Sequence, residues 1–428
     1  MRGSRGLRTV IETLAISTGP LRNRNFRLLW IGQTASQIGN GAFNVALAIE
    51  ALRLDGHPAG LALILAARIA PAVILLPFGG LLADRLARRR TLLVADAARA
   101  LAVSTVGFAI IAGADSVWLL IAMSIVFGVA NAMFAPALVG MVPELIGKKE
   151  LVAGSSLNAA SQEFGQTLLG PIVGGAVVAV GGTGDCFLFN GATFVLSTIA
   201  LFMLVAPKGI TRKAQRPDVW SELKEGLGFV ARTAWLRNST ILTAMMNFLA
   251  FSTYAVLIPV YVRESLHASP EALGLVFACG GLGGLAAAAA GPRIRTRTYP
   301  LSSVLLCFFC SAVSFSLVGL VSRLWLVAVL SGLSWALMTL GNVLAVPLLQ
   351  GAVPQGLVGR VASVDLMMSL ALSPAGIVVA GVVAGGIGPG RTIVVDGALA
   401  AACAVLPGMR RLRGYDTDIV KAWSACDG

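Results

Sequence analysis

Charged residues are scarce in this sequence. Asp, Glu, Lys and Arg make up 12% of its 428 residues, against roughly 25% in an average soluble domain. Hydrophobic residues make up 57%, and the mean hydropathy is +0.83. A water-soluble chain of this length could not cover its surface with so few charges, and a disordered chain would lack the apolar residues. The composition therefore indicates a multi-pass membrane protein.

Residues and motifs on which many enzymes depend are also missing. The two histidines, His57 and His267, fall in segments that connect apolar runs, and no HExxH metal motif occurs. An intramembrane enzyme is therefore only a remote alternative, and we expect neither a metal site nor a cofactor. No GxxxxGK[S/T] motif occurs either, which argues against ATP-driven pumping by this chain alone.

The six cysteines do not form the framework of a small disulfide-rich secreted protein. Cys307 and Cys310 form a CxxC pair inside an apolar run, where we interpret both as packed thiols. No small-residue cleavage site follows a short apolar core near the N-terminus, so we expect no signal peptide.

Twelve apolar runs are long enough to cross a bilayer, which takes about 20 residues in a helix. Lipid offers backbone groups no partners, so each run is expected to be helical. The first six runs lie near residues 28–52, 59–82, 91–113, 118–141, 156–181 and 186–206. The second six lie near 240–262, 271–291, 301–321, 325–346, 361–386 and 391–407. The sequence thus predicts an all-α membrane protein with two six-helix bundles, over 28–206 and 240–407.

Basic residues are unevenly divided between the two sets of connecting segments. One set holds only four of the 33 Lys and Arg residues, namely Arg53, Arg263, Arg323 and Arg391. Nearly all the others lie in the opposite set, which includes the segment 1–27 and the tail 408–428. The positive-inside rule places this basic set, with both termini, on the cytoplasmic side of the inner membrane. The same distribution explains the net charge of +13 without nucleic-acid binding, for which no basic and aromatic pattern is visible.

The segment 207–239 separates the two sets of six runs. Apolar residues recur in it at helical spacing: Trp220, Leu223, Leu227 and Val230. This pattern predicts an amphipathic helix on the cytoplasmic membrane face, within a linker between the halves.

An internal repeat relates the two halves. ANAMFAPALVGMVP (130–143) aligns without gaps with GNVLAVPLLQGAVP (341–354), and the alignment matches Asn131 with Asn342 and both prolines of each segment. The fourth run is therefore equivalent to the tenth. Parallel repeats of this kind are typical of transporters that work by alternating access.

The second run ends in GGLLADRLARRR (79–90). Gly80, Asp84, Arg85, Arg88 and Arg89 match the G-x-x-x-D-R-x-x-R-R loop signature, so the chain resembles the major facilitator superfamily. The resemblance implies that Asp84 holds a cytoplasmic gate closed against Arg360 and the start of the eleventh helix, and that Arg88 reaches Glu144. It also implies that helices 1, 4, 7 and 10 line a central cavity and that helices 2, 5, 8 and 11 form the moving seam.

The fifth run contains GQTLLGPIVGG (165–175). Gly170, Pro171, Gly174 and Gly175 resemble the core of the exporter motif of this superfamily. The proline removes a helix hydrogen bond, and the glycines allow the halves to approach closely. An ordinary packing face of small residues is the alternative. The sequences of segments 21–40 and 142–158 are similar to those of the macrolide-efflux and siderophore-exporter branch.

Charged residues within apolar runs are costly and need a reason. We consider four of them as candidates for proton coupling: Arg68, Glu163, Glu50 and Asp396. The alternative for each is an internal ion pair or a capped backbone group.

Amide and aromatic residues on the expected lining helices are candidates for the substrate cavity. Gln33, Gln37, Asn40 and Asn44 share one face of the first helix by their spacing. The other helices contribute Asn131, Asn247, Tyr254, Trp335 and Asn342. Each could instead make a hydrogen bond between helices. A cavity of this kind suits a bulky, largely apolar cargo.

The sequence therefore favours a secondary transporter that exports a small molecule, such as a drug, antibiotic or siderophore-like metabolite, by proton antiport. An uptake carrier for a nutrient or lysolipid is the alternative. Because one chain can hold the whole pathway, we expect a functional monomer in the lipid bilayer, with protons and a small-molecule substrate as partners.

Overall fold

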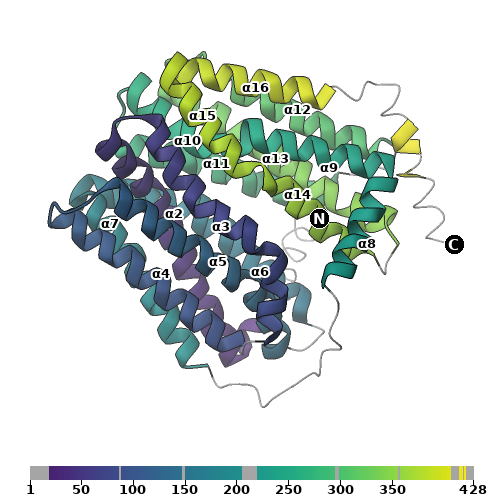
Figure 1. Cartoon of the computed structure of the whole chain (residues 1–428), viewed down its shortest axis with the longest axis horizontal. Coiled ribbons are helices and arrows are strands. Elements are labelled where there is room, and N and C mark those ends of the chain that lie inside the picture. Colours follow the sequence, from purple (N-terminus) through teal and green to yellow (C-terminus); the bar gives the residue numbers. More distant parts are fainter. Residues whose placement is uncertain are drawn as a thin grey trace, which may run out of the picture.

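The computed structural model describes residues 19–85, 88–146, 150–204, 219–294, 298–354, 357–405, 414–417 and 419–420. The described residues form helices joined by turns and short irregular connections, and they contain no strand. In Figure 1 the helices form two groups, an N-terminal half in purple to teal and a C-terminal half in green to yellow.

The N-terminal half begins with a short turn, Gly19–Arg22. Its long helices are α2 (Arg24–Asp55), α3 (Pro58–Arg85), α4 (Arg88–Ile111), α5 (Val117–Leu145), α6 (Leu151–Gln162), the π-helical segment η3 (Glu163–Leu169) and α7 (Gly170–Phe202). Asn23 caps α2, because its side chain accepts hydrogen bonds from the backbone N–H groups of Asn25 and Phe26.

The C-terminal half follows α8 (Val219–Arg232), the helix predicted within the linker. It comprises α9 (Ala234–Met246), η4 (Asn247–Phe251), α10 (Ser252–Val260), η5 (Tyr261–Ser265), α11 (Pro270–Ala290), α12 (Pro300–Val318), α13 (Leu324–Ala352), α14 (Val358–Ala371), α15 (Ser373–Ile387) and α16 (Pro389–Val405). A 3₁₀ turn, Gly291–Arg293, follows α11.

These helices agree with the twelve predicted spans. Among the described residues, nine continuous helical stretches are long and apolar enough to cross a membrane. One of them, Ala153–Phe202, contains both the fifth and the sixth span, which turn at Gly182 (φ 89°). The first and the last span, α2 and α16, complete the set; α2 carries the polar face described above, and α16 is only 17 residues long.

The seventh span starts earlier than the sequence suggested. Helix α9 begins at Ala234, within the predicted linker 207–239, because the extended backbone of Thr233 is enough to separate it from α8. Residues 207–218 lie outside the described part of the chain.

The repeated segments occupy equivalent places in the two halves. Asn131 and Pro136 lie within α5, and Asn342 and Pro347 lie within α13. Each helix continues past its proline.

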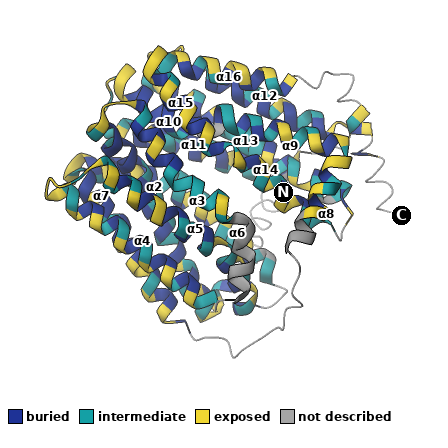
Figure 2. Ribbon diagram, viewed as in Figure 1, coloured by how far each residue is buried: buried dark blue, intermediate teal, exposed yellow. Residues whose placement is uncertain are grey.

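Large apolar side chains on the outside of both halves are exposed. They include Leu101, Phe108, Trp118, Val180, Phe202 and Trp325. Figure 2 shows exposed positions, in yellow, along helices of both groups. A surface of this kind fits lipid tails rather than water.

The two halves meet along α3, α7 and η3 on one side and α11, α14 and α15 on the other. These are spans 2, 5, 8 and 11, the seam that the superfamily resemblance implied. Several of the closest approaches lie at the end of the bundle away from α8, where Gly381 of α15 contacts the first turns of α3 and Gly175 of α7 contacts the start of α11. At the same end, Arg263 donates to the carbonyl of Ile49 at 3.1 Å.

Candidate functional site

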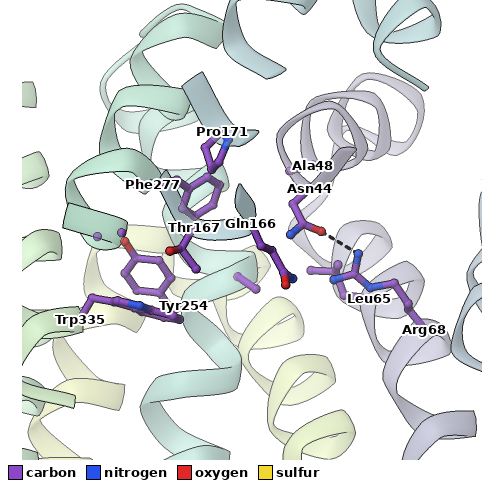
Figure 3. Close-up of a pocket in the computed structure, with 13 residues that line it drawn as sticks. Asn44, Ala48, Leu65, Arg68, Gln166, Thr167, Pro171, Tyr254, Phe277 and Trp335 are labelled. Atoms are coloured by element: carbon purple, nitrogen blue, oxygen red, sulfur yellow. Dashed lines mark hydrogen bonds between the residues drawn. The ribbon is translucent and has the colours of Figure 1, made fainter. Parts of the chain in front are cut away.

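A cavity of about 190 Å³ lies between the two halves. Its walls come from both of them: Asn44, Ala48, Leu65, Arg68, Gln166, Thr167 and Pro171 from the N-terminal half, and Tyr254, Ala255, Phe277, Gly280, Gly281 and Trp335 from the C-terminal half. Figure 3 shows these side chains around the space. A cavity shared by both halves is where a rocking transporter holds its substrate.

Arg68 of α3 provides the charge of the cavity. Its Nη1 donates to Oδ1 of Asn44 on α2 at 2.8 Å. The guanidinium also lies 5.9 Å from the ring centre of Phe43 and 5.8 Å from that of Phe127, within the range of cation–π attraction. Arg68 and Asn44 were assigned separately from the sequence, one to coupling and one to the cavity, and the structure brings them together.

Aromatic residues form the opposite wall. The ring of Tyr254 lies 5.4 Å from that of Trp335 and 6.0 Å from that of Phe277, measured between ring centres. These spacings are those of favourable tilted aromatic pairs. Tyr254 and Trp335 were candidates from the sequence, whereas Phe277 was not.

The π-helical segment η3 supplies Gln166 and Thr167 to the cavity. Proline has no N–H, so Pro171 cannot bond the carbonyl of Thr167, its partner in a regular α-helix. That carbonyl instead faces Gly281 of α11, where a Cβ atom would clash with it. Pro171 was recognised from the sequence, whereas Gln166, Thr167 and Gly281 were not. The signal available for Thr167 was its position four residues before the proline.

The glycines of the exporter-like motif pack against two helices, α2 of the same half and α11 of the other half. A Cβ on Gly170 would lie 2.6 Å from Cα of Gly41, and one on Gly174 would lie 2.6 Å from the backbone of Ala42, so both glycines bring α7 against α2. Gly175 faces α11 of the other half, and a Cβ there would lie 3.1 Å from Cα of Glu271. Pro171 itself lines the cavity.

The loop motif is described only in part. Gly80, Asp84 and Arg85 lie in the last turns of α3, and the side chains of Asp84 and Arg85 are outside the described part of the structure.

Arg88 of the loop motif donates to Oε1 of Glu144 at 2.6 Å and to the carbonyl of Gly140 at 2.7 Å. Arg89 donates to the carbonyl of Leu201 at 3.0 Å, near the end of α7, where a cation is favourable. Arg360, at the start of α14, forms an ion pair with Glu225 of the linker helix α8.

The amide face of α2 meets different neighbours along its length. Asn44 faces the cavity, whereas Nε2 of Gln33 donates to Oγ of Ser197 in α7 at 3.1 Å. Ser197 in turn donates to Asp96 of α4 at 2.6 Å. Gln37 contacts Gly165 of η3 through its Cβ, and Asn40 is half-buried.

Three other cavity candidates do not line the cavity. Asn131 accepts a hydrogen bond from Nη1 of Arg99 at 2.8 Å, inside the N-terminal half. Asn247 donates to the carbonyl of Thr243, one turn back along its own helix, at 3.1 Å. Asn342 is exposed on α13, seven residues after Trp335 and therefore on the same helical face.

The acidic coupling candidates have different surroundings. Glu50 is fully buried, forms an ion pair with Arg53 at 2.5 Å and accepts a hydrogen bond from Thr183. Asp396 lies in α16, outside the cavity lining. Glu163 is the first residue of η3, and its Oε2 accepts a hydrogen bond from Thr167 of the cavity at 3.2 Å.

The known proteins that this chain resembles include transporters of one superfamily. Residues 15–424 match the family described as transmembrane secretion effector. An uncharacterized MFS-type transporter, YfiS of Bacillus subtilis, is 27% identical over 64% of this chain and 65% of its own length. The chain thus spans slightly under two thirds of that relative.

Two further relatives are described as exporters. The multidrug efflux pump Tap of Mycolicibacterium fortuitum is 27% identical over 80% of this chain and 85% of its own length. The enterobactin exporter EntS of Shigella boydii is 21% identical over 78% of this chain and 79% of its own length.

A solved structure has the same fold. The bacterial homologue of the human lysosomal transporter Spinster, in an inward-facing and unoccupied conformation, is 13% identical with a TM-score of 0.66, over 95% of this chain and 96% of its own. The fold, the seam and the match over nearly the whole sequence agree, and this chain belongs to the transmembrane secretion effector family of major facilitator superfamily transporters.

Proposed function

We propose that this transporter exports a small, largely apolar molecule across the cytoplasmic membrane by proton antiport. The observation that carries the proposal is the cavity with walls from both halves. The exporter-like glycines at the seam and the two relatives described as exporters support the outward direction.

Alternating access follows from the contacts between the halves. The approaches at Gly381 and Gly175 close the end away from α8. With the linker side on the cytoplasm, as the distribution of Lys and Arg predicts, substrate would reach the cavity from inside the cell. Rocking of bundles 28–206 and 240–407 would then open the opposite end, and Asp84 would hold the cytoplasmic gate closed.

Glu163 is the favoured proton carrier of this mechanism. It is bonded to Thr167, a residue of the cavity wall. Glu50 is less suitable as a proton carrier because it forms an ion pair with Arg53. Asp396 is less suitable because no described residue of α16 lines the cavity. Arg68 keeps its proton in any protein environment, so it is better suited to binding than to proton transfer.

Everted membrane vesicles test the proposal. With a pH gradient formed by respiration, an exported substrate should release protons and restore the fluorescence of a quenched acridine dye. Macrolides, tetracyclines and catecholate siderophores are the first compounds to screen. Vesicles with the Glu163→Gln variant should show no such recovery but should still bind the compound in a filter assay.

The uptake alternative predicts the opposite result in whole cells. Cells that express an exporter should retain less of a labelled compound than control cells. Greater retention would overturn the proposed direction, and dye recovery unchanged by Glu163→Gln would overturn the proposed proton carrier.

A further inference from the structure

The two walls of the central cavity differ in chemistry. Arg68 and Asn44 lie on one side, and Tyr254, Phe277 and Trp335 lie on the other (Figure 3). The polar Gln166 and Thr167 of η3 lie between them. A ligand that fills this space meets a cation at one end and aromatic rings at the other.

The cation has unused binding capacity. A guanidinium carries five N–H donors, and Asn44 is the acceptor that the described residues provide for Arg68. Within the described part of the chain, no carboxylate forms an ion pair with it, unlike Arg53, Arg88 and Arg99. A cation held within the membrane is costly unless something compensates its charge.

No side chain covers the aromatic wall at Gly280. Gly280 of α11 lies between the rings, where an added Cβ would still be 3.7 Å from the Tyr254 hydroxyl and 3.8 Å from Trp335. The absence of a side chain at this position therefore leaves room for about one methyl group beside Tyr254 and Trp335, both of which line the cavity. Rings of this kind bind planar apolar surfaces by offset or edge contacts.

We propose that the cargo of this transporter is an aromatic organic acid. Its anionic group would bind the free donors of Arg68, and its aromatic body would lie against Tyr254, Phe277 and Trp335. This inference rests on the proposed function, which it narrows from a largely apolar molecule to one with a single anionic end.

Asn44 has a positioning role in this site. Its Oδ1 accepts from Nη1 of Arg68 and directs the guanidinium toward the cavity. Phe43 and Phe127, which do not line the cavity, make further cation–π contacts with the same guanidinium. The donors that face the cavity are then preorganised for a carboxylate, which can accept two of them at once.

Equilibrium binding to the purified full-length protein tests the inference. The probes are 1-pyrenebutyrate, 1-pyrenebutyramide and 1-pyrenebutylamine, which share an aromatic body and differ in the charge of the end group. Energy transfer from tryptophan to pyrene reports binding in detergent, and micelles without protein give the background. The variants are Arg68→Gln, Arg68→Lys and Trp335→Ala, with Arg391→Gln as the matched control, because Arg391 is exposed at the start of α16.

The wild-type protein should bind the butyrate about tenfold more tightly than the butyramide, which is the lower end of what a hydrogen bond to a charged group contributes. Arg68→Gln should abolish this preference, Arg68→Lys should retain part of it, and Arg391→Gln should leave it unchanged. Trp335→Ala should weaken the binding of acid and amide by similar factors. Each variant is first checked for a single symmetric peak in size-exclusion chromatography.

Several results would overturn the inference. They are equal binding of acid and amide by the wild type, preference for the amine, no saturable binding of any probe, or a preference for the acid that survives Arg68→Gln. The assay needs no gradient, so it is independent of proton coupling. Selective acid binding together with no proton release in vesicles would refute the proposed antiport and leave this inference standing.

Discussion

Asp96 and Arg99 form an ion pair one helical turn apart in α4, inside the N-terminal half and away from the cavity. Both side chains are almost fully buried, with exposed fractions of 0% and 5%. Arg99 also lies over the rings of Phe134 and Phe194, at 4.2 and 4.6 Å from their centres. The pair therefore joins α4 to its neighbours rather than contacting substrate.

Removal of the acid should destabilise the protein strongly. Asp96→Ala leaves Arg99 as an uncompensated buried charge, which costs about 3–5 kcal/mol in such settings. The loss should appear as a lower melting temperature of the purified protein in detergent. The double variant Asp96→Leu with Arg99→Met should recover much of it, because no charge then remains; a double variant as unstable as the single one would contradict this account.

Adjacent glycines of α11 should respond differently to the same substitution. A Cβ on Gly281 would clash with the carbonyl of Thr167, whereas one on Gly280 would meet its nearest atom at 3.7 Å. Gly281→Ala should therefore lower stability by about 1–3 kcal/mol through overpacking, and Gly280→Ala should change it little. Thermal unfolding of the two variants in the same detergent makes the comparison, and equal melting temperatures would refute the close contact.

The C-terminal tail should contribute to stability through Asp416. This buried carboxylate accepts hydrogen bonds from the backbone N–H groups of Leu301, at 2.8 Å, and Ser302, at 3.3 Å, in the first turn of α12. Loss of such a cap costs about 0.5–2 kcal/mol. Asp416→Ala should lower the melting temperature, and Asp416→Asn should do so less because an amide oxygen can still accept; the reverse order would argue against capping.

Asp84→Asn should abolish transport without affecting membrane insertion. The substitution removes the charge that is proposed to close the cytoplasmic gate, while the polar shape is kept. Dye recovery in everted vesicles measures transport, and immunoblotting of the membrane fraction measures insertion. Full transport by this variant would remove Asp84 from the gate.

The spans were predictable from the sequence because lipid demands long apolar helices, and the seam followed from the superfamily resemblance. The neighbours that individual polar side chains contact could not be predicted from the sequence. Gln33 and Asn44 share one face of α2, but Gln33 bonds Ser197 of α7 whereas Asn44 bonds Arg68 of α3, so the same face has different neighbours at different heights.

The π-helical backbone of the fifth span also could not be predicted from the sequence. Pro171 indicated a missing hydrogen bond, but the resulting π-helical segment depends on how Gly165 fits against α2 and how Thr167 fits against Gly281 of α11. Such a fit between separate helices is a property of the packed structure. Gln166 and Thr167 were missed for this reason.

The turn at Gly182 limits how the N-terminal half can move. Helix α7 reverses at this one residue, whose backbone (φ 89°, ψ 178°) is practically restricted to glycine, and Thr183 next to it is bonded to Glu50 of α2. Because no loop separates the fifth span from the sixth, the fifth span cannot move along its own axis without moving the sixth. Any displacement of α7 at the central cavity is therefore expected to move the sixth and first spans with it, so that the N-terminal bundle rotates as one body.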